Sequence, residues 1–199
     1  MRYAEILLNF AEAKAELGTL TDAEWASTIG VLRARAGITG GLSAKPTVVD
    51  TYLQTTYFPD ITDPVILEVR RERGIELSLE GLRFADIKRW KRGVLMKMEW
   101  NGFYVPELNK AMDLNEDGIN DVAFYQGATT PPLGKIEYVN VSPKIGTNDN
   151  SQRLKNDTFG ELTWMNNLTR SWEDKHYYYP IPKNDLLQNP NLTQNPGWQ

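Results

Sequence analysis

The stretch that decides the fold is Arg2-Tyr3-Ala4-Glu5-Ile6-Leu7-Leu8-Asn9-Phe10-Ala11-Glu12-Ala13-Lys14-Ala15-Glu16-Leu17, at the start of the chain. Its apolar side chains form a stripe at helical spacing, which consists of Tyr3, Leu7, Phe10 and Leu17, with Ile6 and Ala13 beside it. This pattern predicts an amphipathic helix over residues 2–17. Gly18 follows directly and is typical of a helix C-terminus.

A second helix is predicted immediately after the first. Thr21 or Asp22 can cap its N-terminus, and Glu24 completes a capping box with Thr21. The face beyond the cap is apolar as far as Gly37 and consists of Trp25, Ile29, Leu32 and Ala36. Two helices joined by a short turn form an αα-hairpin over residues 1–37, similar to a tetratricopeptide-like unit. The sequence shows no second copy, so it does not support an array of repeats.

The rest of the chain is read as one domain with the hairpin, over residues 1–199. Residues 38–62 contain Gly40-Gly41, Pro46 and Pro59 and are predicted to be a connector. Helices are predicted over residues 63–92, from the Asp63-Pro64 start and with a break near Gly81. The remainder is predicted to be a loop-rich region over residues 93–175, with strand-like pieces at 122–125 and 136–139, and an extended tail with a one-turn helix over residues 176–199. The predicted fold class is mainly α, with minor β-strands.

Composition excludes several classes of function. The net charge of −4 gives no electrostatic reason to expect nucleic acid as a partner. The chain has no cysteine, which excludes disulfides, thiolate metal sites and cysteine nucleophiles, and its one histidine, His176, cannot form a histidine-rich zinc site. No secretion signal or membrane-spanning apolar stretch is present. The first helix begins at residue 2 without a capping residue, which an ordinary start and a cut through a longer protein explain equally well.

Four stretches carry a family resemblance. They are residues 2–13, residues 31–37, residues 71–77 continuing through 80–90, and residues 178–182 followed by 189–198. Their sequences are RYAEILLNFAEA, VLRARAG, RERGIEL with EGLRFADIKRW, and YYPIP with NPNLTQNPGW. Together, and in this order, they resemble the C-terminal part of the SusD/RagB family. The resemblance covers nearly the whole chain and is patchy between Gly93 and Lys175.

This resemblance implies a mostly helical fold and a role without catalysis in capturing glycans or other nutrients. It implies exposure at the bacterial outer membrane through a lipid anchor on an N-terminal cysteine. It also implies a SusC-like TonB-dependent transporter as the partner that receives an oligosaccharide or polysaccharide. The family's N-terminal half and its anchor cysteine have no counterpart in this sequence, so we expect anchoring, and part of the ligand site, to lie outside this chain.

The sharpest local pattern lies in the loop-rich region. Oxygen-bearing side chains alternate around Gly118 in the way that an EF-hand loop surrounds a hard cation. The predicted Ca²⁺ ligands are Asp113, Asn115, Asp117, the carbonyl of Ile119, and Asp121. Phe124 stands where an EF-hand needs its final glutamate, so a structural calcium loop is expected rather than a complete EF-hand. The alternative is an Asx-rich turn without a metal.

Aromatic side chains are the predicted ligand-binding residues. Sugar rings have apolar C–H faces, and aromatic side chains bury such faces at low entropic cost. The candidates in the loop-rich region are Trp100, Tyr104, Trp164 and Trp172. For each of them the alternative is packing beneath its own loop.

Two other functions compete with glycan binding. A structural or adaptor module would use the tetratricopeptide-like helices to bind a protein without a small ligand. A glycoside hydrolase would need two carboxylates isolated in a cleft, whereas Glu72, Glu76 and Glu80 share one helix face. We interpret them as part of an ion-pair network with Arg73, Arg83 and Arg89, and no catalytic residue is predicted.

A final expectation concerns the surface of the first helix. If this chain is part of a longer protein, faces that pack on missing helices are left uncovered. We therefore expect an exposed apolar patch near Tyr3, Leu7 and Phe10.

Overall fold

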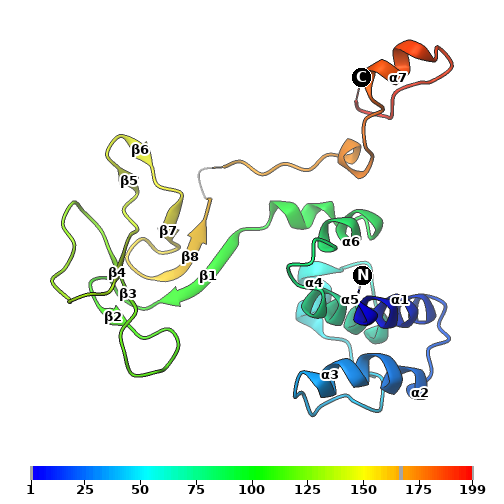
Figure 1. Cartoon of the computed structure of the whole chain (residues 1–199), viewed down its shortest axis with the longest axis horizontal. Helices are drawn as coiled ribbons and strands as arrows, with labels where there is room; N and C mark the ends of the chain where they lie inside the picture. Colours follow the sequence, from blue (N-terminus) through cyan, green and yellow to red (C-terminus); the bar gives the residue numbers. More distant parts are fainter. Residues whose placement is uncertain (1, 166–167, 199) are drawn as a thin grey trace. The chain divides into compact units, whose positions relative to one another are not determined.

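The computed structural model describes residues 2–165 and 168–198. Backbone contacts divide the chain into two compact units. The helical unit comprises Met1–Leu95 together with Glu173–Gln199, and the strand unit comprises Met96–Trp172. Helices dominate over short strands in the described residues, so the predicted fold class is confirmed (Figure 1).

The predicted hairpin is present at the start of the helical unit. Helix α1 (Tyr3–Glu16) is followed by an almost continuous helical segment that consists of α2 (Asp22–Trp25), the π-helical turn η1 (Ala26–Gly30) and α3 (Val31–Arg35). The Thr21 hydroxyl accepts a hydrogen bond from the backbone N–H of Glu24 at 3.2 Å, and the Glu24 carboxylate accepts one from the Thr21 N–H at 2.9 Å. The capping box read from the sequence is therefore confirmed.

The core of the helical unit uses a different face of α1 from the apolar stripe that the sequence offers. Tyr3 and Leu17 are 75% and 74% exposed, and Ile6 and Phe10 are also exposed. The face that packs on α5 and η1 carries Leu8 and alanine side chains. Alanine is small, so it lets neighbouring helices approach closely. The buried apolar residues of this face are Ala4, Leu8, Ala11 and Ala15. Tyr3 and Phe10 are exposed as expected, whereas Leu7 is half-buried and packs against the core.

The segment predicted as a connector contains a helix, so that prediction is wrong for its second half. Helix α4 (Thr51–Tyr57) is capped at its N-terminus by Asp50, whose carboxylate accepts a hydrogen bond from the backbone N–H of Leu53 at 2.9 Å. Leu53 and Phe58 are buried against Leu67, which explains why so short a helix is stable.

Two more helices follow and complete the helical layer. Helix α5 (Pro64–Glu76) begins with an Asp63 cap and a proline in its first turn, as predicted. It ends at Glu76, before the predicted break near Gly81, and Leu79 beyond it has a left-handed backbone with φ of 63°. Helix α6 (Arg83–Arg89) and the 3-10 turn η2 (Gly93–Lys97) come next.

The C-terminal tail belongs to the helical unit. It contains the 3-10 turn η3 (Asp174–Tyr177) and helix α7 (Lys183–Gln188). The Tyr177 hydroxyl accepts a hydrogen bond from the backbone N–H of Gly93 at 2.9 Å. The Lys88 ammonium lies 3.6 Å from the centre of the Tyr179 ring. These contacts confirm the expectation that the tail packs back on the helices.

The described residues of the strand unit form three small sheets. One has the order β1 (Trp100–Val105), β8 (Gly160–Trp164), β7 (Gln152–Leu154), and all its pairings are antiparallel. Another has the order β2 (Ala111–Met112), β3 (Val122–Tyr125), β4 (Glu137–Asn140), with β3 and β4 parallel. The third is a hairpin of β5 (Lys144–Ile145) and β6 (Asn148–Asp149). The core beneath them consists of Val105, Val122, Phe124, Val141 and Leu154.

The predicted strand pieces correspond to β3 and, shifted by one residue, to β4. The loop prediction for residues 93–175 is wrong at β1 and β8, which are the two longest strands of the unit. None of the helices in the described part of the chain combines the length and the apolar character that crossing a membrane requires.

Candidate functional site

Three of the four predicted aromatic residues lie in one sheet of the strand unit. Trp100 on β1 is the register partner of Trp164 on β8, and Tyr104 is the partner of Glu161. Trp164 is 43% exposed and Tyr104 is 55% exposed, so both rings are accessible to a ligand. The Trp100 side chain lies outside the described part of the structure. Trp172, which follows β8, is half-buried and belongs to no strand.

The register separates these aromatic side chains onto two faces. Trp164 and Glu161 are three residues apart on β8, and side chains alternate between faces along a strand. Tyr104 shares the face of Glu161, so it points away from the face that carries Trp164. An irregularity between Asn101 and Tyr104 produces this arrangement, because it adds an unpaired residue to β1. The sequence alone would place Trp100 and Tyr104 on the same face.

The loop predicted to bind calcium is held by hydrogen bonds from its own backbone. The Asp113 carboxylate accepts from the N–H groups of Glu116 at 2.8 Å and Gly118 at 2.7 Å. The Asn115, Asp117 and Asp121 side chains accept backbone N–H groups in the same way. This is the pattern of an Asx-rich turn. No three acidic or histidine side chains gather as a metal site within the residues described, and calcium binding by this loop stays a prediction.

The charged residues of α5 and of the turn after it form an ion-pair network, but their partners differ from the predicted ones. Glu72 pairs with Arg33, Glu76 with Arg2 and Arg35, and Glu80 with Arg2. The predicted partners face other groups. Arg73 donates to Asp86 at 2.8 Å, and Arg89 bridges Asp86 and Glu12. The network ties α5 to the hairpin and to α6, so each of these carboxylates serves an ion pair rather than standing free.

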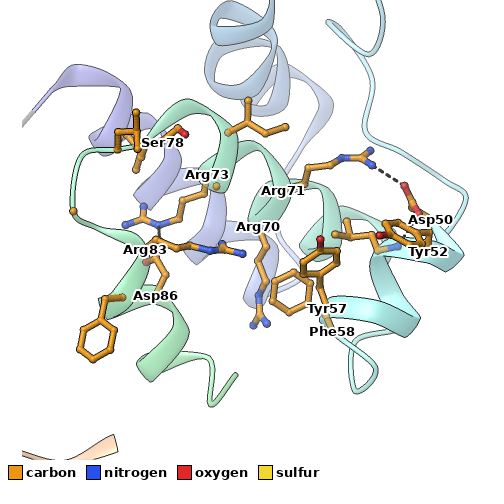
Figure 2. A pocket seen from close by; sticks show the side chains of 17 residues that line it. Asp50, Tyr52, Tyr57, Phe58, Arg70, Arg71, Arg73, Ser78, Arg83 and Asp86 are labelled. Atoms are coloured by element: carbon orange, nitrogen blue, oxygen red, sulfur yellow. Dashed lines mark hydrogen bonds and ion pairs between the residues drawn. The ribbon is translucent and has the colours of Figure 1, made fainter. Parts of the chain in front are cut away.

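A cavity of about 710 Å³ opens in the helical unit between α4, α5 and α6 (Figure 2). Its walls are formed partly by Tyr57, Phe58 and Phe84 and partly by apolar residues of the turn after α5. Four arginines and two aspartates also line it: Arg70, Arg71, Arg73, Arg83, Asp50 and Asp86. Its size is that of a pocket for a small ligand.

Three of these arginines have carboxylate partners, and one does not. Arg71 donates to Asp50 at 2.6 Å, Arg73 to Asp86 at 2.8 Å, and Arg70 to Glu16 at 2.9 Å. The Nη1 atom of Arg83 is buried and has no hydrogen-bond partner among the described residues. Burial lowers the pKa of the Arg83 guanidinium, because it penalises the charged form more than nearby Asp86 favours it.

The sequence reasoning missed this cavity, because it assigned the arginines of this region to ion pairs. The sequence predicts ion pairs for the run Arg70-Arg71-Glu72-Arg73 and for Arg83. It does not indicate which guanidinium group has no carboxylate hydrogen-bonded to it. That outcome depends on α4, whose Asp50 pairs with Arg71 and whose aromatic side chains form one wall. A helical reading of residues 50–58 is the signal that would have indicated a pocket.

Comparisons with known proteins give a matching family model and similar solved structures. A family model described as "SusD family" matches residues 1–198. A SusD-like protein from Bacteroides fragilis has a similar solved structure, with 22% identity and a TM-score of 0.53, and the match covers 100% of this chain and 25% of that one. A structure designated BT4246 gives 24% identity and a TM-score of 0.52, covering 100% and 23%. This chain thus spans about a quarter of their length. No curated protein matches it.

Proposed function

The chain belongs to the SusD family, and from that membership we propose that it is part of a non-catalytic glycan-binding protein of an outer-membrane uptake complex. In this proposal the whole protein is lipid-anchored at the cell surface and passes an oligosaccharide to a SusC-like TonB-dependent transporter. The family match over residues 1–198 is the observation that carries the proposal.

The exposed aromatic residues of the strand unit support glycan binding in this chain. Trp164 is the cross-strand partner of Trp100 in the β1–β8 pair, and its ring is accessible to a flat apolar sugar face. We propose Trp100, Tyr104, Trp164 and Trp172 as ligand-binding residues. Because Tyr104 and Trp164 lie on different faces, we expect Trp164→Ala and Tyr104→Ala to affect binding unequally.

The state of the carboxylates supports a role without catalysis. A glycosidase needs an acid and a base free to act on either side of a glycosidic bond. Glu12 and Asp86 are buried and bound by Arg89, and Glu68 and Glu72 are buried and bound by Arg33. Because these carboxylates are engaged in ion pairs inside the helical unit, they do not form the free pair that a glycosidase requires.

An adaptor function is the second candidate, and the exposed face of α1 is the observation that favours it. Tyr3, Ile6 and Phe10 form an uncovered apolar surface on one helix. Such a surface suits contact with another polypeptide better than contact with a sugar.

Affinity electrophoresis of the 199-residue chain against a panel of polysaccharides tests the leading proposal. We expect retardation by at least one glycan without release of reducing ends, and loss of retardation in Trp164→Ala. Tyr3→Ala is the matched control, since Tyr3 is an exposed aromatic residue of the helical unit. No retardation by any glycan for a folded sample would favour the adaptor function, and release of reducing ends would contradict the non-catalytic role.

A further inference from the structure

We propose that the cavity between α4, α5 and α6 binds the carboxylate of a small sugar acid, and that Arg83 is the residue that holds it. This site lies in the helical unit and uses none of the aromatic residues proposed above. The proposed carboxylate site does not depend on glycan binding by the strand unit.

Charge is the first argument. Four arginines and two aspartates line the cavity, and both aspartates are engaged by Arg71 and Arg73. Arg70 has its partner on α1, in Glu16. Arg83 contributes a guanidinium whose Nη1 atom is buried without a partner among the described residues. A guanidinium does not lose its proton at neutral pH, and nearby Asp86 offsets its charge only in part, so an anion in the cavity would compensate the remainder.

The aromatic neighbour of Arg83 does not supply that compensation. The Arg83 guanidinium lies 5.5 Å from the centre of the Trp90 ring, within range of a cation–π contact. The guanidinium groups of Arg70 and Arg89 lie at 4.8 Å and 4.6 Å from the same ring. The guanidinium groups of Arg70, Arg83 and Arg89 thus share one indole ring, which attracts each of them only weakly, and they repel one another. Figure 2 shows Arg83 reaching into the cavity, toward Arg70.

The residues that line the cavity indicate the kind of molecule that carries the carboxylate. Tyr57 and Phe84 belong to the lining and provide aromatic surface for a ring, whereas Phe58 is buried beneath it. Tyr52 and Ser78 place hydroxyl groups at the lining, where they can bond to the hydroxyls of a sugar. A single unpaired guanidinium matches a monovalent carboxylate in charge, and its planar fork matches it in shape. A uronic acid combines these features.

Titration calorimetry of the 199-residue chain with glucuronate tests the proposal, with glucose, benzoate and sulfate as comparison ligands. We expect glucuronate to bind and glucose to bind at least about tenfold more weakly, because a charge-assisted hydrogen bond is lost. Equal binding of sulfate would show a general anion site and overturn the assignment. Equal binding of benzoate would overturn the sugar as the ligand, and no binding of glucuronate would overturn the site itself.

Two variants locate the binding group. Arg83→Gln should abolish glucuronate binding, whereas Lys91→Gln, which removes the same charge from an exposed position just beyond α6, should leave it unchanged. Gly74→Ala keeps the charge and suits a helix, but its new methyl group would lie 3.2 Å from the Arg83 Nη1 atom and displace it. We expect weaker binding in Gly74→Ala with helical content retained. Unchanged binding in both Arg83→Gln and Gly74→Ala would contradict the role of Arg83.

Discussion

Replacing Asp86 by alanine should remove a large part of the stability of the helical unit. Asp86 is 2% exposed, and its two oxygens accept hydrogen bonds from Arg73 at 2.8 Å and Arg89 at 2.9 Å. Breaking a buried ion pair by removing one partner costs about 3–5 kcal/mol, because the other charge stays buried. Arg73 keeps Asn9 at 2.7 Å, and Arg89 is partly solvated, so we expect a loss of about 3 kcal/mol, at the lower end of that range.

Urea unfolding followed by circular dichroism at 222 nm measures this loss of stability. The signal reports on the helical unit, because helices α1 to α7 all belong to it. With a slope of about 2 kcal/mol per molar urea, the midpoint should fall by about 1.5 M. Asp60→Ala is the control. Asp60 is 88% exposed and 4.0 Å from Arg92, so its loss should cost less than about 1 kcal/mol. A loss below about 1 kcal/mol for Asp86→Ala would refute the reasoning, since Arg73 would then tolerate burial without this partner.

Three further predictions follow from local features. Gly30→Ala should destabilise the chain by about 2 kcal/mol or more in the same assay, because its methyl group would lie 2.1 Å from the Leu42 carbonyl oxygen, whereas Gly40→Ala meets open space and should change stability by less than about 1 kcal/mol. The pKa of the Glu24 carboxyl is held below its usual range by the Thr21 backbone N–H and by Lys14, so the folded state binds fewer protons there and stability should fall as the pH drops below about 5. Glu24→Gln should flatten that part of the pH profile, and an unchanged profile would contradict the assignment. Calcium at a hundredfold excess over its dissociation constant should stabilise the strand unit by about 2.7 kcal/mol in thermal unfolding if the loop around Gly118 binds it. Asp113→Ala should remove this effect and Glu116→Ala should retain it, while equal melting temperatures with calcium and with chelator would leave the Asx-rich turn as the correct reading.

Features set by neighbouring residues were predictable from the sequence. The Thr21–Glu24 capping box and the Asp63-Pro64 start involve atoms within one helical turn, so the local pattern contains the information. Helix α4 escaped prediction because most of its stability comes from burial of Leu53 against Leu67, which is a tertiary contact. The same reason explains α1. Its large apolar residues suggested one face, but the alanines opposite them pack closely on α5.

Features set by distant pairing were not predictable. Strand β1 contains Asn101 and Gly102 and gains its structure from β8, which is about sixty residues further along the chain. The choice of partner for each arginine of α5 likewise depends on α1, α3, α4 and α6 together. The sequence indicated an ion-pair network there, and only the assembled helices show that Arg83 is left facing a cavity.

Because the C-terminal tail belongs to the helical unit, the strand unit is an insertion between two segments of that unit. The hydrogen bond from Gly93 to Tyr177 joins the two segments of the helical unit that flank the strand unit. Within the strand unit, Arg170 donates to the carbonyl of Met98 at 3.2 Å and joins its two ends. When the ends of an insert are already held together, changing its length costs little additional loop entropy. Loops of the strand unit outside its core of Val105, Val122, Phe124, Val141 and Leu154 can therefore change in length or sequence at little cost to the helical unit. We expect ligand preference to vary among related proteins mainly through the strand unit. We also expect that this unit can be replaced as a whole by protein engineering.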